Sequence, residues 1–181
     1  MHRLYTMNKA KTTAVSGMMG ALSVVIMLLS SVLPILMYIL PIATGMIVLF
    51  VSLLYNKKWG FGVYAVTSFL CLLLLTDKET ALAYAMFFGY YPLVKDSFEK
   101  IPVVVAYPLK LILFNASAVG MGLAGVYIFG LSAEEYYEFG KATIPILLGL
   151  GNVVFVLYDF MITKYMFIAE DMSRKFKSII K

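Results

Sequence analysis

The sequence predicts an all-α membrane protein, a bundle of six transmembrane helices, and three observations lead to this prediction. Apolar residues make up 62% of the 181 residues, whereas charged residues make up only 14%. Apolar segments long enough to cross the roughly 30 Å hydrocarbon core of a bilayer recur along the chain. Lysine and arginine gather between these segments. Because nothing is left over for a soluble domain, we expect one transmembrane domain over residues 1–181.

The first predicted span, residues 12–31, is a run of twenty residues without a charge. Arg3, Lys9 and Lys11 precede it without any acidic residue. This asymmetry predicts a cytoplasmic N-terminus, since basic residues stay on the inner side of the membrane. The span is too long for the apolar region of a typical cleavable signal, and no small-residue cleavage site follows it.

Small side chains form a strip along the first half of this span. The strip contains Ala14, Gly17, Gly20 and Ala21, with two serines beside them. Small residues let two helix backbones approach closely, which is how helices associate in lipid. The strip therefore indicates either packing inside this protein or docking of another membrane subunit.

The other spans are expected at residues 34–55, 60–76, 80–94, 103–131 and 142–167. Pro41 lies near the outer end of the second span and predicts a kink or an unwound turn there. The residues between the spans are polar: Asn56–Lys58 and Lys95–Lys100 on the inner side, Asp77–Glu79 and the acidic stretch 132–141 on the outer side.

The distribution of basic residues supports six spans with both termini in the cytoplasm. Eleven of the fifteen lysine and arginine residues lie in the terminal regions or after the second and fourth spans, and Lys164 lies near the inner end of the sixth span. Lys78 and Lys141 fall on the outer side, and Lys110 falls within the fifth span. An even number of spans is what two cytoplasmic termini require.

Two charged residues lie well inside predicted spans, Lys110 in the fifth and Asp159 in the sixth. The two spans run antiparallel, and each residue lies about eight positions from the inner end of its helix, so the two can meet at one depth. An unpaired charge costs about 2.5 kcal/mol or more within a bilayer. Either a structural ion pair or a pair that breaks when a partner binds fits the pattern. Asn115 and Asn152 form a second polar match near mid-membrane.

Aromatic and hydroxyl side chains gather near the outer ends of the spans. A concave surface with aromatic rings and a few polar groups suits a small organic ligand. Tyrosine is also frequent at membrane interfaces, so an ordinary aromatic belt explains part of this set. As ligand-binding residues we predict Tyr38, Thr80, Tyr84, Tyr127 and Tyr136.

The sequence gives little support for enzyme chemistry, cofactors, metals or nucleic acid. The single histidine is His2 and the single cysteine is Cys71, too few for a metal cluster. No Gly-rich phosphate loop, nucleophile elbow or carboxylate pair is present. If the protein transports a solute actively, the energy must come from a partner or an ion gradient.

Taken together, six short spans, cytoplasmic termini and the small-residue strip resemble the S component of energy-coupling factor (ECF) transporters. In that family an Ala-x-x-x-Ala-type motif in the first helix docks on the T component. Gly17-Met-Met-Gly20-Ala21, with Ala14 one turn earlier, matches this position with one alanine replaced by glycine. The resemblance implies a ligand site on the outer side, built from the first outer loop and spans four to six. It names no ligand.

We therefore expect a multi-pass subunit of the cell membrane that binds a small, water-soluble, vitamin-like nutrient. It would work with a membrane T component and two ATPase subunits, in contact with lipid and without nucleic acid. Two alternatives stay open: a scaffold in a cell-shape or sporulation complex, and a small ion-coupled carrier that uses Asp159.

Overall fold

A computed structural model describes residues 9–130 and 143–179, and the regular structure in these ranges is entirely helical. In chain order the elements are α1 (Lys9–Ser30), the 3₁₀ turn η1 (Pro34–Leu36), α2 (Ile39–Leu54), α3 (Lys57–Leu74), α4 (Lys78–Ala83), the π-helical turn η2 (Tyr84–Phe88), α5 (Tyr91–Phe98), α6 (Val103–Phe129) and α7 (Thr143–Ile179). The all-α class predicted from the sequence is confirmed.

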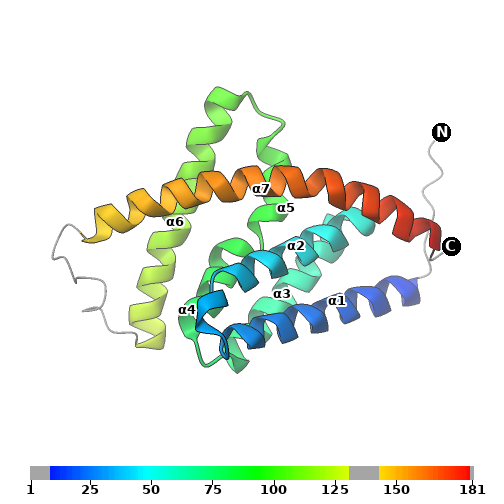
Figure 1. Cartoon of the computed structure of the whole chain (residues 1–181), viewed down its shortest axis with the longest axis horizontal. Coiled ribbons are helices and arrows are strands. Elements are labelled where there is room, and N and C mark those ends of the chain that lie inside the picture. The colour runs from blue at the N-terminus through cyan, green and yellow to red at the C-terminus, as the bar shows by residue number, and fades with distance from the viewer. Residues whose placement is uncertain (1–8, 131–142, 180–181) are drawn as a thin grey trace.

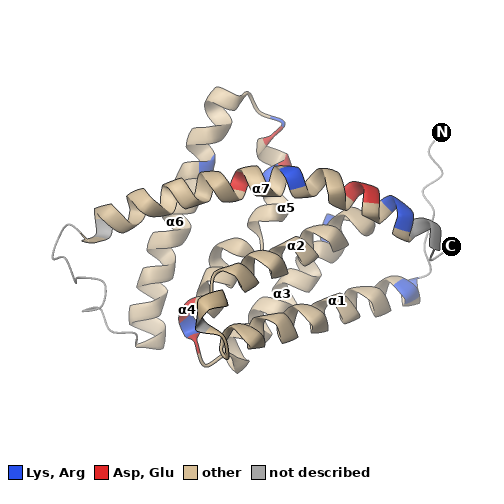
Figure 2. Ribbon diagram, in the orientation of Figure 1, with Lys and Arg blue, Asp and Glu red and all other residues tan. Residues whose placement is uncertain are grey.

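Three of these helices are long and apolar enough to cross a membrane: α1, α6 and the Pro145–Phe176 part of α7. Helix α2 is apolar but shorter. Long stretches of α1, α6 and α7 carry no charged residues (Figure 2). The charged residues lie mostly toward one side of the molecule, apart from a small group at α4 (Figure 2). The molecule is thus a helical membrane protein, whereas the number of passes stays a prediction.

Helices α1, α2 and α3 pack against one another, and α7 packs across α2 (Figure 1). The start of α1 and the end of α7 lie at the same side of the molecule (Figure 1). Helix α6 diverges from the α1–α3 group and is held mainly by α4, η2, α5 and α7. The α5–α7 region is therefore a second unit of packing, joined to the first through α2.

The predicted polar turn between α3 and α4 caps both helices. The Lys78 ammonium donates hydrogen bonds to the carbonyl oxygens of Leu72 (3.0 Å) and Leu75 (2.6 Å) at the end of α3. The Asp77 carboxylate accepts the Glu79 N–H at 3.1 Å at the start of α4. Helix ends leave backbone groups without intrahelical partners, so these contacts explain why the chain reverses here.

The fourth predicted span, residues 80–94, is not one continuous helix. It consists of α4, the π-helical turn η2 and then α5, which begins at Tyr91. Pro92 explains the break, because it has no N–H to bond the carbonyl oxygen of Phe88 four residues earlier. The Gly89 N–H instead donates to the Tyr84 carbonyl at 2.8 Å, five residues back.

Side chains from other helices bond the carbonyl groups that the irregular turn exposes. The Tyr64 hydroxyl donates to the Ala85 carbonyl at 2.6 Å, and the Tyr158 hydroxyl donates to the Phe88 carbonyl at 3.4 Å. A broken helix is tolerated at membrane depth only where such partners exist. The turn therefore depends on α3 and α7 for its stability.

Two helices begin or end away from the bounds of the predicted spans, and the span bounds themselves stay predictions. Helix α7 continues to Ile179, beyond the predicted end of the sixth span at residue 167. Salt bridges four residues apart support this extension: Glu170–Arg174 at 3.8 Å and Asp171–Lys175 at 2.9 Å. At the start of the second predicted span the chain forms a 3₁₀ turn followed by α2, and Pro41 lies in the first turn of that helix, where its missing N–H is tolerated.

Aromatic side chains form the largest buried cluster, where η2, α5 and α7 meet. Phe87 stacks on Tyr91 with ring centroids 4.9 Å apart, and Phe155 stacks on Phe114 at 5.0 Å. Met46 and Leu49 bring α2 into the same cluster. Because Phe155, Tyr158 and Ile162 of α7 belong to this cluster, it sets the rotation of α7 and so the side on which the buried Asp159 lies.

Gly45 lies so close to η2 that a single added methyl group should have a strong effect. A Cβ atom at Gly45 would lie 2.3 Å from the Phe88 carbonyl oxygen, closer than real Cβ contacts allow. Gly45→Ala should therefore push α2 away from η2 and lower the midpoint of thermal unfolding in detergent by several degrees. Gly62→Ala, where a Cβ meets nothing within 4 Å, is the matched control and should leave it unchanged. Equal midpoints for both variants would show that α2 does not pack on η2 in this way.

Candidate functional site

Asp159 is the centre of a buried polar cluster inside the apolar part of α7. The residue is 3% exposed, and Phe155 and Ile162, one turn away on either side, are also buried. Residues three or four apart lie on one face of a helix. This face of α7 is turned toward α5 and α6, so the carboxylate points into the protein.

Donors from two other helices surround this carboxylate. On α6, the Lys110 ammonium lies 3.0 Å from Asp159 Oδ2 and 3.2 Å from Oδ1. On α5, the Lys95 ammonium and the Tyr91 hydroxyl each donate to Oδ1 at 2.5 Å. We call these four residues, Tyr91, Lys95, Lys110 and Asp159, the Asp159 cluster.

The two lysines are as deeply buried as the carboxylate. Lys95 is 1% exposed and Lys110 is 4% exposed. Lys95 also lies 3.0 Å from the carboxylate of Glu99, one turn further along α5. Removing one member of a buried ion pair leaves an uncompensated charge and costs about 3–5 kcal/mol. The cluster therefore ties α5, α6 and α7 together at one point.

The structure brings Lys110 and Asp159 together, as their positions in the sequence suggest. Lys95 and Tyr91 are missing from the charge pair predicted from the sequence, because Lys95 falls in a predicted inner loop. The structure corrects this assignment: Lys95 belongs to α5, and its side chain points inward. A helix that starts at Tyr91, with Pro92 in its first turn, would have placed Tyr91, Lys95 and Glu99 on one face, but the short polar stretch resembled a loop.

A second polar contact joins α6 to α7. The side-chain NH₂ group of Asn115 donates to the side-chain oxygen of Asn152 at 2.9 Å, and the NH₂ group of Asn152 donates back to the side-chain oxygen of Asn115 at 3.1 Å. Each amide also donates to a carbonyl of its own helix, on Leu111 at 2.8 Å and Leu148 at 2.7 Å. Because these polar groups have partners, the pair acts as a structural link and leaves no open hydrogen-bonding site.

The predicted ligand-binding residues lie in different environments. Thr80 and Tyr84 are fully buried, and the Thr80 hydroxyl donates to Asp77. Tyr38 is 52% exposed, and Tyr127 near the end of α6 is 83% exposed. Tyr136 lies outside the described residues. Thus Thr80 and Tyr84 belong to the interior, whereas Tyr38 and Tyr127 are on the surface.

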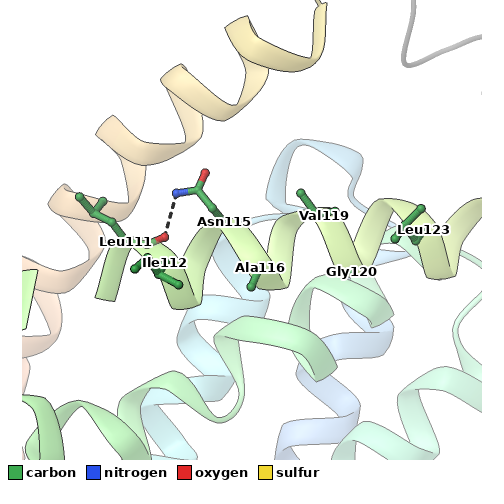
Figure 3. A pocket seen from close by; sticks show the side chains of 7 residues that line it. All are labelled: Leu111, Ile112, Asn115, Ala116, Val119, Gly120 and Leu123. Carbon is green, nitrogen blue, oxygen red and sulfur yellow. Dashed lines mark hydrogen bonds between the residues drawn. The ribbon is translucent and has the colours of Figure 1, made fainter. Parts of the chain in front are cut away.

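An open apolar groove of about 650 Å³ runs along α6 (Figure 3). None of the four predicted ligand-binding residues that the structure describes, Tyr38, Thr80, Tyr84 and Tyr127, lines it. Asn115 is the only polar residue among the described residues that line it, and its amide is already bonded (Figure 3). The lining consists of Leu111, Ile112, Asn115, Ala116, Val119, Gly120 and Leu123. An apolar surface of this kind at membrane depth suits hydrocarbon better than a polar nutrient.

The small-residue strip of α1 divides between two faces. Gly20 is buried, and a Cβ there would lie 3.8 Å from a methyl group of Val63 on α3. Ala14, Gly17 and Ala21 are exposed, and a Cβ at Gly17 would meet nothing within 4 Å. The structure thus divides the strip: Gly20 packs internally, whereas Ala14, Gly17 and Ala21 face outward, and docking of another subunit stays a prediction.

Comparison with models of protein families, with curated proteins and with solved structures gives no match for this chain.

The free energy of unfolding should depend on the balance of charges in the Asp159 cluster. Asp159→Asn leaves two buried lysines without their carboxylate, so it should lower the free energy of unfolding by about 3–5 kcal/mol. Adding Lys110→Met should restore much of this loss, since Lys95 keeps Glu99 as its partner. Adding Lys95→Met should restore less, because Lys110 then stays buried without a negative partner.

Thermal unfolding of the purified chain in detergent checks this order of stabilities. The exposed pair Lys57–Asp96, 2.9 Å apart, is the control. Lys57 holds the pKa of the Asp96 carboxyl below its usual value, but breaking such a surface pair should cost at most about 1 kcal/mol. If Asp159→Asn costs no more than Asp96→Asn, the buried cluster does not stabilise the fold.

Proposed function

We propose that this protein is the substrate-binding membrane subunit of a nutrient uptake system of the ECF type. In this proposal it binds a small, water-soluble, vitamin-like molecule from outside and works with a T component and two ATPase subunits. The observation that carries the proposal is the outward-facing part of the α1 strip, Ala14, Gly17 and Ala21. The sequence resemblance described above points to the same surface.

The two faces of α1 support a docking role over a purely internal one. The buried face packs on the protein through Thr12, Ser16, Gly20, Ser23, Val24, Met27 and Ser30. Since that face already supplies the internal contact, the exposed small residues are not needed for packing within the described residues. A smooth exposed strip permits another helix to approach closely. We therefore propose that the T component contacts α1 at Ala14, Gly17 and Ala21, next to the buried Gly20.

The proposed topology has six passes and both termini in the cytoplasm. The passes are α1, η1 with α2, α3, α4 with η2 and the first turn of α5, α6, and the apolar part of α7, and the rest of α5 lies on the inner side. The charge distribution of the sequence supports this orientation. The proposed ligand site is on the outer side, near the surface residues Tyr38 and Tyr127 and the interior pair Thr80 and Tyr84.

Two other functions make different demands on the structure. A carrier that uses Asp159 needs a carboxylate that accepts and releases an ion during transport. Lys95, Lys110 and Tyr91 already bind this carboxylate, and this arrangement suits a structural role better than ion transport. A scaffold in a cell-shape or sporulation complex can use the same α1 surface, so the copurifying partner decides between scaffold and transporter.

The orientation can be tested with single introduced cysteines. The native Cys71 is fully buried, so its background reactivity should be low. We expect Glu135→Cys to react with a membrane-impermeant thiol reagent in intact cells and Lys58→Cys to react only after permeabilisation. The reverse pattern would invert the topology and move the proposed ligand site to the inner side.

The docking role can be tested by enlarging the exposed strip. The double variant Gly17→Leu, Ala21→Leu should keep the stability of the isolated protein and any copurifying small molecule, because neither side chain enters the core. It should lose the copurifying T component and ATPases, and nutrient uptake in cells should fail together with them. Copurification and native mass spectrometry measure these outcomes.

Two matched variants separate docking from general effects. Gly149→Leu on α7, where a Cβ also meets nothing within 4 Å, should keep both stability and partners. Gly20→Leu, on the buried face beside Val63, should destabilise the isolated protein. If the partners still bind the Gly17→Leu, Ala21→Leu variant at normal affinity, the docking proposal is wrong. Copurification of cell-wall proteins in place of ATPases would favour the scaffold.

A further inference from the structure

The charge balance of the Asp159 cluster depends on a residue at the protein surface. Lys95, Lys110 and Asp159 are almost fully buried and together carry two positive charges and one negative charge. Glu99, whose side chain is 37% exposed, lies 3.0 Å from Lys95 and brings the sum to zero. A buried net charge is strongly unfavourable. Neutrality therefore depends on a carboxylate that reaches the cluster from the surface.

Glu99 is placed unfavourably for a permanent partner of Lys95. It is the C-cap residue of α5, and the C-terminal end of a helix carries a partial negative charge that disfavours a carboxylate. A lysine four residues before a glutamate is also the weaker order for such a pair in a helix. The helix itself thus favours release of Glu99, and Lys95 alone opposes it in the contacts described here.

We infer that the surface side of Lys95 is an anion site, in which an oxyanion takes the place of the Glu99 carboxylate. When the partly exposed Glu99 side chain rotates outward, it leaves the position beside the Lys95 ammonium open. A carboxylate or phosphate oxygen there restores the charge balance, and lysine is a common point-charge ligand for such groups. The anion comes either from solution or from a lipid headgroup. The inference does not depend on the proposed uptake function.

The variant Glu99→Gln removes the internal competitor and tests this site. We measure the thermal unfolding midpoint of the purified full chain in neutral detergent as phosphate or acetate replaces chloride at constant ionic strength. The wild-type chain should be stabilised saturably, and Glu99→Gln should reach half-saturation at a lower concentration. The difference should be about tenfold if Glu99 occupies the position about nine-tenths of the time. Without added oxyanion, Glu99→Gln should unfold at a lower temperature than wild type.

Two variants distinguish this site from general salt effects, since phosphate stabilises many proteins by exclusion from their surfaces. Glu99→Gln combined with Lys95→Met should lose the saturable response. Asp96→Asn also removes a carboxylate from α5 beside the exposed Lys57 and Lys100, and it should show no gain over wild type. An equal gain in Asp96→Asn, or a response that survives Lys95→Met, would overturn the inference.

Mixed micelles identify the source of the anion. If phosphatidylglycerol, but neither phosphatidylcholine nor free phosphate or acetate, stabilises Glu99→Gln in a Lys95-dependent way, the anion is a lipid headgroup. If free oxyanions suffice, the source is in solution. No saturable response to any of them overturns the inference. Should Glu99→Gln fail to fold, the comparison of wild type with Lys95→Met stays decisive, because only wild type should respond saturably.

Discussion

The packing of the C-terminal half depends on one buried carboxylate. Asp159 receives hydrogen bonds from α5 and α6 while it lies on α7, so three helices meet at a single acceptor group. Helix α6 is otherwise largely exposed along its length. Burial of apolar surface gives little driving force between helices in lipid. Polar contacts therefore decide where α6 lies, at Lys110 near one end and at Asn115 near its middle.

The break in the fourth predicted span is a condition for this arrangement. Because Pro92 cannot continue the α4 helix, the chain passes through a π-helical turn and α5 starts with a new direction. Along α5, Tyr91, Lys95 and Glu99 follow one another at intervals of four residues and share a face. The first two reach Asp159, and the third reaches the surface beside Lys95. The break thus connects the buried cluster to the outside of the protein.

The N-terminal half is built on different contacts. Small and hydroxyl residues of α1 pack against α2 and α3, while Ala14, Gly17 and Ala21 are exposed on the opposite face. In the proposed transporter, the N-terminal and C-terminal halves have different roles. The exposed strip provides the contact with a partner, and the α5–α7 unit with its ion pairs provides a rigid body. The contact of α7 with α2 joins the two.

The sequence by itself determines the helical membrane class, the polar turn at Asp77 and the pair formed by Lys110 and Asp159. Apolar run length and the cost of an isolated charge in lipid depend only on the chain. The tertiary structure alone decides that Lys95 is buried, that Glu99 balances its charge, and that Gly20 faces inward while Gly17 faces outward. These properties depend on the rotation of each helix about its axis. That rotation is set by contacts between segments far apart in the sequence, such as Gly45 with Phe88 and Phe155 with Phe114.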